Sequence, residues 1–416
     1  MHCRILALLA LCLAVPAQAE EPAKEFFFKP NDRIVFLGDS ITQQYQYSSY
    51  MELYLTTRMP KGNFVFINAG IGGDTAQGGA GRFQNDVLNE KPTAVTINFG
   101  MNDGGYGKFD AAKNKVFVDK TKAMVEMAKK ASVRVALCSP NAVDKRMMNN
   151  GKEYVETQKQ FYAPLKELAA NQKVSFADQF TLTRAATDKM ETVDAGAKVA
   201  KPYYDGFHTS PPGGILMAHA ILTELNAPAV VSSATVLANN TKIAVPMPVG
   251  CTISDVEKSE IGVTFTRLDE ALPLPVQKDW LPMLPYMNDL KDLNAYGLTV
   301  IGLKDGSYDV SIDGAKVASA TAKELATGVN LGNVTTGPIF EQSNKVLVAI
   351  DAKNRMVIDR FFNVVRFNVP NWVEDVAPGV KTKELTKRME KINAAQAEIY
   401  KLATPKSHKF SVTLAK

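Results

Sequence analysis

The chain has 416 residues, 46% of them hydrophobic, with 48 basic and 43 acidic residues and a net charge of +5 at pH 7. This length exceeds what one hydrophobic core usually serves, so we expect two domains. The small basic excess is spread along the chain, which argues against a nucleic-acid-binding protein, because such proteins concentrate basic side chains on one face.

The first nineteen residues have the pattern of a secretory signal peptide. Arg4 precedes an apolar run over residues 5–16, and the Ala-Gln-Ala sequence at 17–19 fits the small-x-small site of a signal peptidase. The apolar run is shorter than the roughly 20 residues that span a bilayer, so a retained anchor is the less favoured alternative. We expect an exported protein, periplasmic or extracellular, without stable membrane insertion.

From residue 33 to about residue 230, short apolar runs alternate with segments of helical periodicity. The runs are rich in β-branched and aromatic residues and lack polar alternation, which is typical of strands buried on both faces of a parallel sheet. The runs lie at 33–37, 64–67, 94–99, 133–137 and 174–177, and the helical segments near 50–58, 80–89, 111–130 and 153–171. The alternation predicts an α/β fold with a doubly wound parallel sheet, whose ligands bind beyond the carboxyl ends of the strands.

The first predicted strand ends in the triplet Gly38-Asp39-Ser40. A serine at the end of a strand, where a turn begins, is held out of the core and into the cleft. The glycine before it permits a tight backbone. The triplet is common by chance, but at the end of the first strand of an α/β domain it indicates a candidate nucleophile.

The next two strands end in segments that can donate hydrogen bonds into the same cleft. Glycines at 70, 72 and 73 let backbone N–H groups approach a ligand closely. A dinucleotide loop is disfavoured, because Thr75 stands where the third glycine of that motif belongs. After the third strand, Asn102 can donate through its side-chain amide, although an ordinary Asn-Asp-Gly turn explains the same residues.

Asp205 and His208 form a fourth polar segment, just before a predicted helix. Residues three apart in a helical turn share one face, so Asp205 can hold one ring nitrogen of His208 while the other faces the cleft. Beyond the signal peptide the other histidines are His219, inside the following helix, and His408, in a Lys-flanked segment where we expect it to be exposed. His208 is therefore the leading candidate for a general base.

These four segments, in this order, resemble the four sequence blocks of the SGNH/GDSL hydrolases over about residues 30–228. The Gly-x-Ser-x-Gly elbow of classical α/β-hydrolases is absent around Ser40. The resemblance implies a flavodoxin-like sheet and an enzyme that needs no metal or organic cofactor. The site residues that it implies are a catalytic triad of Ser40, Asp205 and His208, and an oxyanion hole made of the N–H groups of Ser40 and Gly73 and the amide of Asn102. Gly72, next to Gly73, is the alternative backbone donor.

The implied activity is ester hydrolysis through an acyl-serine intermediate. The pattern is similar to the acetylesterase branch that acts on plant or algal polysaccharides. The Gln/Tyr run at 43–47 suits sugar hydroxyls better than a lipid tail, although an ordinary polar loop explains it equally well. Our main hypothesis is therefore a carbohydrate O-acetylesterase, whose substrate is a small ester or an acetylated polysaccharide. A lipid or aryl esterase, an acyltransferase and a non-catalytic glycan-binding envelope protein stay open as alternatives, and so does the oligomeric state.

After about residue 230 the pattern changes, and we expect an accessory region at 231–416 that packs against the hydrolase domain at 20–230. The sequence of this region predicts short strands within 236–277 and 295–318, helices at 341–365 and 380–402, and a last strand at 408–414. The Lys-Asp-Gly-Ser sequence at 304–307 indicates a hairpin. Trp280 and Trp372 are either sugar-stacking platforms or core residues. Cys138 and Cys251 fit either a disulfide or two buried thiols.

Overall fold

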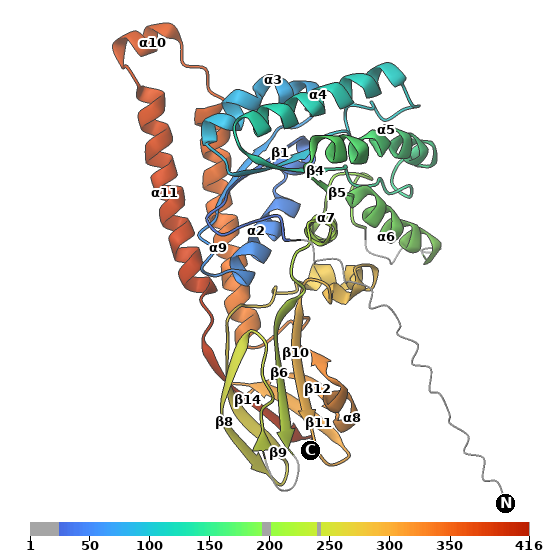
Figure 1. The fold of residues 1–416 in the computed structure, drawn as a ribbon, viewed down its shortest axis with the longest axis vertical. Coiled ribbons are helices and arrows are strands. Elements are labelled where there is room, and N and C mark those ends of the chain that lie inside the picture. Colours follow the sequence, from blue (N-terminus) through green and yellow to red (C-terminus); the bar gives the residue numbers. More distant parts are fainter. Residues whose placement is uncertain (1–24, 194–200, 239–242, 416) are drawn as a thin grey trace, which may run out of the picture.

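The computed structural model describes residues 25–193, 201–238 and 243–415 of the chain (Figure 1). The predicted signal peptide at 1–19 lies outside these ranges. Within them, no helix combines the length and the apolar character that crossing a bilayer requires.

The central sheet has five parallel strands in the order β2-β1-β3-β4-β5. Their bounds are β1 Arg33–Gly38, β2 Val65–Gly70, β3 Ala94–Asn98, β4 Arg134–Cys138 and β5 Ser175–Ala177. The predicted doubly wound sheet is confirmed, and each predicted run overlaps one of these strands. Since β1 lies between β2 and β3, the strand order reverses at the end of β1, and this is where such sheets bind their ligands.

Helices cover both faces of the central sheet. Along β1, Ile34 and Phe36 pack on the side of α2 and α7, whereas Val35 and Leu37 pack on the side of α3, α4 and most of α5. The helices of this half are α1 Ser40–Gln43, α2 Gln46–Arg58, α3 Ala76–Asp86, α4 Ala111–Lys130, α5 Gly151–Gln172, α6 Gln179–Val193 and α7 Pro211–Glu224, with a 3-10 turn η1 at Leu88–Glu90.

The sequence analysis missed α6. Its threonines have a low helix propensity, which hides the helical signal. In the structure the hydroxyls of Thr183 and Thr187 donate to backbone carbonyls one turn back, at Gln179 and Thr183. The helix therefore forms with its threonine hydroxyls satisfied internally.

The C-terminal half contains two further sheets that share one hydrophobic core, as in a β-sandwich. Their strand orders are β13-β10-β6-β7 and β12-β11-β14-β9-β8. The bounds of the elements are β6 Val230–Ala238, β7 Ile243–Ala244, β8 Cys251–Ser259, β9 Gly262–Asp269, β10 Ala295–Ile301, β11 Ser307–Ile312, β12 Ala315–Thr321, β13 Val329–Asn330, β14 Ser407–Leu414, α8 Ala322–Thr327, η2 Lys278–Tyr286 and η3 Asn288–Leu290.

Two sequence expectations for this half are wrong. The turn at 304–307 does not close a hairpin, because β10 is already paired with β6 and β13, and β11 pairs in the other sheet. The tight hairpin lies between β11 and β12, where Asp313 and Gly314 both have positive φ. His408 is buried rather than exposed, because β14 runs between β11 and β9 and the His408 Nδ1 lies 2.7 Å from Asp313 Oδ2.

The two tryptophans differ in burial, and the two cysteines beyond the predicted signal peptide are both buried. Trp280 is fully buried against Tyr50 at a ring distance of 4.7 Å, so it is a core residue and no stacking platform. Trp372 is 68% exposed. Cys138 and Cys251 are both buried free thiols.

The C-terminal helices return to the central sheet. They are α9 Pro338–Arg360, which continues in a π-helical turn η4 at Phe361–Val365, α10 Asn371–Val376 and α11 Val380–Ala403. Figure 1 shows α9 and α11 running side by side along the first half of the chain, after which the chain re-enters the sandwich as β14. The C-terminal region thus packs on the first half in two places, and the predicted boundary near residue 230 stays a prediction.

Cations of α9 and the turn after it pair with carboxylates of the first half. Lys353 Nζ lies 2.7 Å from Glu52 Oε1 on α2, and both side chains are buried. Arg360 Nη1 lies 2.7 Å from Glu90 Oε1, and Arg366 Nη1 lies 2.9 Å from Asp86 Oδ2. These pairs join α9 and the turn after it to α2, α3 and η1.

Replacing Lys353 by Ala should leave Glu52 as a buried, unpaired carboxylate and lower the free energy of unfolding by about 3–5 kcal/mol. Urea denaturation of the full chain measures this. The exposed Lys345→Ala on the same helix is the control, with an expected change below about 0.5 kcal/mol. A Lys353→Ala variant as stable as this control would contradict the prediction.

Candidate active site

Ser40, Asp205 and His208 meet at the carboxyl end of the central sheet. Ser40 is the first residue of α1, directly after β1 and Asp39. The His208 Nε2 lies 2.8 Å from Ser40 Oγ, and the His208 Nδ1 lies 2.6 Å from Asp205 Oδ2. A base between a hydroxyl and a carboxylate is the arrangement of a serine catalytic triad. The structure therefore brings the three predicted residues together.

The loop from Asp205 to His208 is shaped by its own aspartate. Asp205 Oδ1 accepts hydrogen bonds from the backbone N–H groups of Phe207, at 3.2 Å, and His208, at 2.9 Å. Partial burial disfavours the charged carboxylate. The hydrogen bonds from the His208 ring and from these two N–H groups outweigh the effect of burial, so the pKa of Asp205 is held below its usual value. The carboxylate is therefore ionised at neutral pH and can stabilise a charged imidazole beside it.

Two aromatic rings contact the His208 imidazole. Tyr204 stacks on it at a ring distance of 5.7 Å and an interplanar angle of 11°, and Phe207 lies 4.3 Å away. Tyr204 is 58% exposed, so it forms part of the surface next to the site. The imidazole is thus restricted in rotation and keeps one nitrogen toward Ser40.

The Gln/Tyr run at 43–47 is largely occupied by contacts within the protein. Gln43 Oε1 accepts from the Gly72 N–H, and Gln44 Oε1 accepts from the N–H and the hydroxyl of Thr209, both at 3.1 Å. Tyr47 is buried, with its hydroxyl 2.8 Å from that of Thr42. The polar-loop interpretation therefore fits these three residues, which position segments of the site.

The two candidate oxyanion segments differ in how much of their donor capacity is free. The Gly72 N–H is taken by Gln43, whereas the Gly73 N–H has no acceptor among the described residues. Gly73 has φ +73, which favours glycine, and no atom within 4 Å of where a Cβ would stand. This geometry favours Gly73 over Gly72 as the backbone donor.

The amide of Asn102 is held from both ends. Its Nδ2 donates to the backbone carbonyl of Asp74 at 2.9 Å, and its Oδ1 accepts from the Tyr106 hydroxyl at 2.6 Å. A primary amide has two N–H groups, so one stays available for a ligand. The sequence analysis did not find Tyr106, because its contact with Asn102 arises only in the folded turn.

Arg82 on α3 joins the ends of β1 and β2 beneath this site. Its guanidinium donates to the carbonyl of Gly38 at 3.1 Å, to the carbonyl of Ala69 at 2.7 Å, and to the carboxylates of Asp74 at 2.7 Å and Asp86 at 3.2 Å. Asp74 directly follows Gly73, so Arg82 also positions the oxyanion segment. No sequence signal distinguished Arg82 from other basic helix residues.

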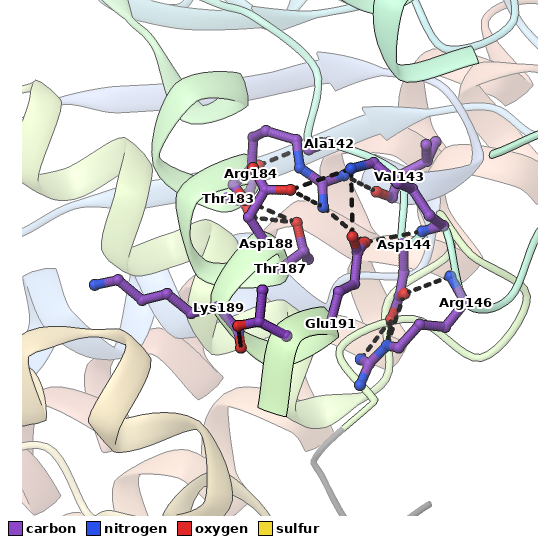
Figure 2. Close-up of polar contacts among 12 residues, drawn as sticks. Ala142, Val143, Asp144, Arg146, Thr183, Arg184, Thr187, Asp188, Lys189 and Glu191 are labelled. Atoms are coloured by element: carbon purple, nitrogen blue, oxygen red, sulfur yellow. Dashed lines mark hydrogen bonds and ion pairs between the residues drawn. The ribbon is translucent and has the colours of Figure 1, made fainter. Parts of the chain in front are cut away.

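The loop that carries His208 rests on the segment after β4. The Asp144 N–H donates to the Gly206 carbonyl at 2.8 Å, and the Asn141 amide donates to the Phe207 carbonyl at 3.2 Å. Figure 2 shows how α6 supports this segment in turn: Arg184 reaches the Val143 carbonyl at 2.7 Å and the Glu191 carboxylate at 2.6 Å. The missed helix α6 therefore helps position the base.

Comparison with known proteins gives the family of this site. The model of the GDSL-like lipase/acylhydrolase family matches residues 36–213, which include every predicted site residue. The chain carries a hydrolase domain of this family. That domain is of the SGNH type and is a serine ester hydrolase domain.

Relatives cover different parts of the chain. An acetylxylan esterase of Geobacillus stearothermophilus is 25% identical over 216 residues, 47% of this chain and 94% of the esterase. An uncharacterized lipoprotein of Bacillus subtilis is 32% identical over 118 residues, so the match spans 26% of this chain and about half, 48%, of the lipoprotein. The solved structure of a gut microbial diltiazem-metabolizing enzyme superposes with a TM-score of 0.79 and 24% identity, over 95% of this chain and 100% of that one. The fold of the hydrolase domain and of the C-terminal region therefore occurs together in another protein.

Two buried carboxylates lie beneath the hydrolase site. Asp39 Oδ1 accepts from the Ile41 N–H at 3.0 Å and caps α1, and Asp103 Oδ1 accepts from the Ala76 N–H at 2.9 Å. Burial, together with the nearby Asp103 and Asp74 charges, raises the pKa of Asp39 to about 7. Burial also raises the pKa of Asp103 to about 6. The local charge under Ser40 therefore changes near neutral pH.

Asp39→Asn should change how stability depends on pH. The folded protein binds the Asp39 proton more tightly than the unfolded chain does, so the free energy of unfolding falls as pH rises from the ordinary value of 3.8 toward 7. The slope of this loss reaches about 1.4 kcal/mol per pH unit. Asparagine keeps the capping oxygen and does not ionise, so urea denaturation at pH 5 and pH 8 should show a flatter profile. The exposed capping residue Asp110 supplies the control Asp110→Asn. A slope equal to that of the wild type would contradict the assignment.

Tyr106→Phe tests the positioning of Asn102 in the predicted oxyanion hole. The variant keeps the ring but loses the hydrogen bond to Asn102 Oδ1, so the amide can turn away. We expect kcat for p-nitrophenyl acetate to fall about 10-fold with KM unchanged, less than the 100–1000-fold typical of removing a donor outright. Tyr308→Phe, in the sandwich, should have no effect. A changed KM with constant kcat would point to a substrate contact instead.

Proposed function

We propose that this chain removes acetyl groups from carbohydrate through an acyl-Ser40 intermediate. The observation that carries the proposal is the continuous hydrogen-bonded series from Ser40 through His208 to Asp205, next to the donors at Gly73 and Asn102. A serine hydroxyl is a weak nucleophile until a base takes its proton, and His208 Nε2 lies at hydrogen-bond distance from it.

The first half-reaction forms the acyl-enzyme. Ser40 Oγ attacks the ester carbonyl carbon while its proton passes to His208 Nε2, and Asp205 stabilises the resulting imidazolium. The N–H groups of Ser40 and Gly73 and the Asn102 amide bind the negative oxygen of the tetrahedral intermediate. Collapse of that intermediate breaks the ester C–O bond, and His208 gives its proton to the leaving sugar hydroxyl.

The second half-reaction returns the enzyme to its starting state. A water molecule gives a proton to His208 Nε2 and attacks the acetyl carbonyl carbon of the acyl-serine. The tetrahedral intermediate then releases acetic acid, with the bond to Ser40 Oγ broken and the proton of His208 returned to that oxygen. Every proton moves between Ser40, His208, substrate and water, so this scheme uses no metal or organic cofactor.

The carbohydrate substrate is supported by the likeness to the acetylxylan esterase, which spans 94% of that enzyme. We further propose that the chain is exported after cleavage of residues 1–19, since that segment has the pattern of a signal peptide and one relative is a lipoprotein. In this proposal residues 20–230 are the hydrolase domain and residues 231–416 the accessory region.

Ser40→Ala should lower acetate release from acetylated xylan, glucomannan and pectin, and from p-nitrophenyl acetate, by at least 10³-fold without lowering stability. Ser254→Ala, an exposed serine on β8, is the control and should keep full activity. Release from a glycan by the wild type alone supports the whole proposal. Cleavage of the aryl ester alone would refute the carbohydrate substrate, and equal turnover by Ser40→Ala would refute the acyl-serine mechanism.

A further inference from the structure

A polar pocket of about 360 Å³ lies where α9 packs beside the start of α2. We call it the α9 pocket. Figure 1 shows the two helices side by side. Its walls come from both halves of the chain: Gln44, Tyr45 and Gln46 after the nucleophile, and Asp351 and Arg355 on α9. The hydrolase domain alone would therefore supply only one wall of this pocket.

Gln44 connects the α9 pocket with the catalytic site. Gln44, in the pocket wall, donates its backbone N–H to the Ser40 carbonyl at 3.0 Å, and its side chain binds Thr209, the neighbour of His208. Its amide also donates to the hydroxyl of Tyr204 at 3.3 Å, the exposed ring that stacks on His208. A substrate with its ester at Ser40 can therefore extend across Tyr204 and Gln44 into the pocket.

The two charged groups of the α9 pocket, Asp351 and Arg355, influence each other electrostatically, but no hydrogen bond holds either of them within the described residues. Asp351 and Arg355 lie one helical turn apart, both exposed, and neither makes a hydrogen bond or ion pair with any residue of the described ranges. The Tyr45 hydroxyl is buried and also lacks a partner in the described part of the chain. By contrast, the charged groups of Lys353 and Arg360 on the same helix are engaged by carboxylates. Asp351 and Arg355 thus present to the pocket an acceptor and a donor that no hydrogen bond within the described residues occupies.

The type of ligand follows from these groups. A carboxylate accepts hydrogen bonds and a guanidinium donates them, so a hydroxyl-rich neutral molecule can satisfy both at once. An anion would meet Asp351, a cation would meet Arg355, and an apolar chain would leave both groups unpaired. The buried Tyr50 and Leu347 add an apolar surface of the kind that small-molecule sites combine with a few polar groups. These features fit a sugar.

We propose that the α9 pocket binds a sugar residue next to the acetylated one, on the alcohol side of the scissile ester. The inference rests on the proposed carbohydrate esterase activity of Ser40. It gives the C-terminal region a part in substrate selection, because Asp351 and Arg355 reach the substrate only when α9 is docked on α2.

The test compares substrates of different length. Acetylated xylose, acetylated xylo- and manno-oligosaccharides of two to four residues, and p-nitrophenyl acetate are given to the wild type and to the double variant Asp351→Ala/Arg355→Ala. We expect KM for the oligosaccharides to rise about 10-fold, the effect of losing a hydrogen bond to a charged group, with kcat unchanged. Acetylated xylose and p-nitrophenyl acetate, which do not reach the pocket, should be cleaved as by the wild type.

The matched control is Glu341→Ala/Lys345→Ala, which removes one acid and one base at the same spacing on α9, both exposed and outside the pocket. It should behave as the wild type, and the thermal midpoints of both variants check their folding. Wild-type KM values in the pocket variant, or an equal loss on all substrates, would overturn the subsite while leaving the esterase intact. A wild type that cleaves p-nitrophenyl acetate but no acetylated carbohydrate would overturn the carbohydrate substrate, and the subsite with it.

Discussion

The buried guanidinium of Arg82 is the contact on which the geometry of the site depends most. It binds four acceptors from four segments, the ends of β1 and β2 and the carboxylates of Asp74 and Asp86. A guanidinium is planar and rigid, so acceptors that share it are fixed relative to one another. Ser40 lies two residues after Gly38, whose carbonyl binds Arg82, and Gly73 directly precedes Asp74. One side chain therefore holds the segments that carry Ser40, the proposed nucleophile, and Gly73, the proposed backbone donor.

The same cation also offsets the charge beneath the site. Burial, and then the nearby charges of Asp103 and Asp74, raise the pKa of Asp39, and Arg82 pairs directly with Asp74. Asp86, the other carboxylate on Arg82, is bound in turn by Arg366 from the C-terminal region. Asp74, which follows Gly73, is thus linked to the C-terminal region through three ion pairs in series, Asp74–Arg82, Arg82–Asp86 and Asp86–Arg366. Because a buried charge that loses its partner is costly, these pairs favour one docking position over near alternatives.

The fold of the first half follows from short-range patterns in the sequence. Strands buried on both faces appear in the sequence as continuous apolar runs. Ser40, Gly73 and Asn102 lie in the segments that follow three of these runs, and Asp205 and His208 lie just before α7. What the sequence could not reveal are contacts between segments far apart in the chain. Tyr106 on Asn102, Asn141 on the His208 loop and Arg82 under β1 and β2 are each ordinary residues in their own segment. The hairpin error has the same origin, since the turn at 304–307 is local but the partners of β10 are not.

Charged residues on α9 divide into two groups by their surroundings. Lys353 and Arg360 face the hydrolase domain and pair with Glu52 and Glu90. Asp351 and Arg355 are four residues apart on the same helix, a spacing at which an acid and a base stabilise a helix by about 0.2–0.5 kcal/mol, and both line the pocket. Since that contribution is small, a ligand can replace the interaction between the two groups at little cost to folding. In the proposed subsite, docking and substrate recognition use different residues of one helix. Substitutions at Asp351 and Arg355 can then change the substrate range without disturbing the contacts that hold α9.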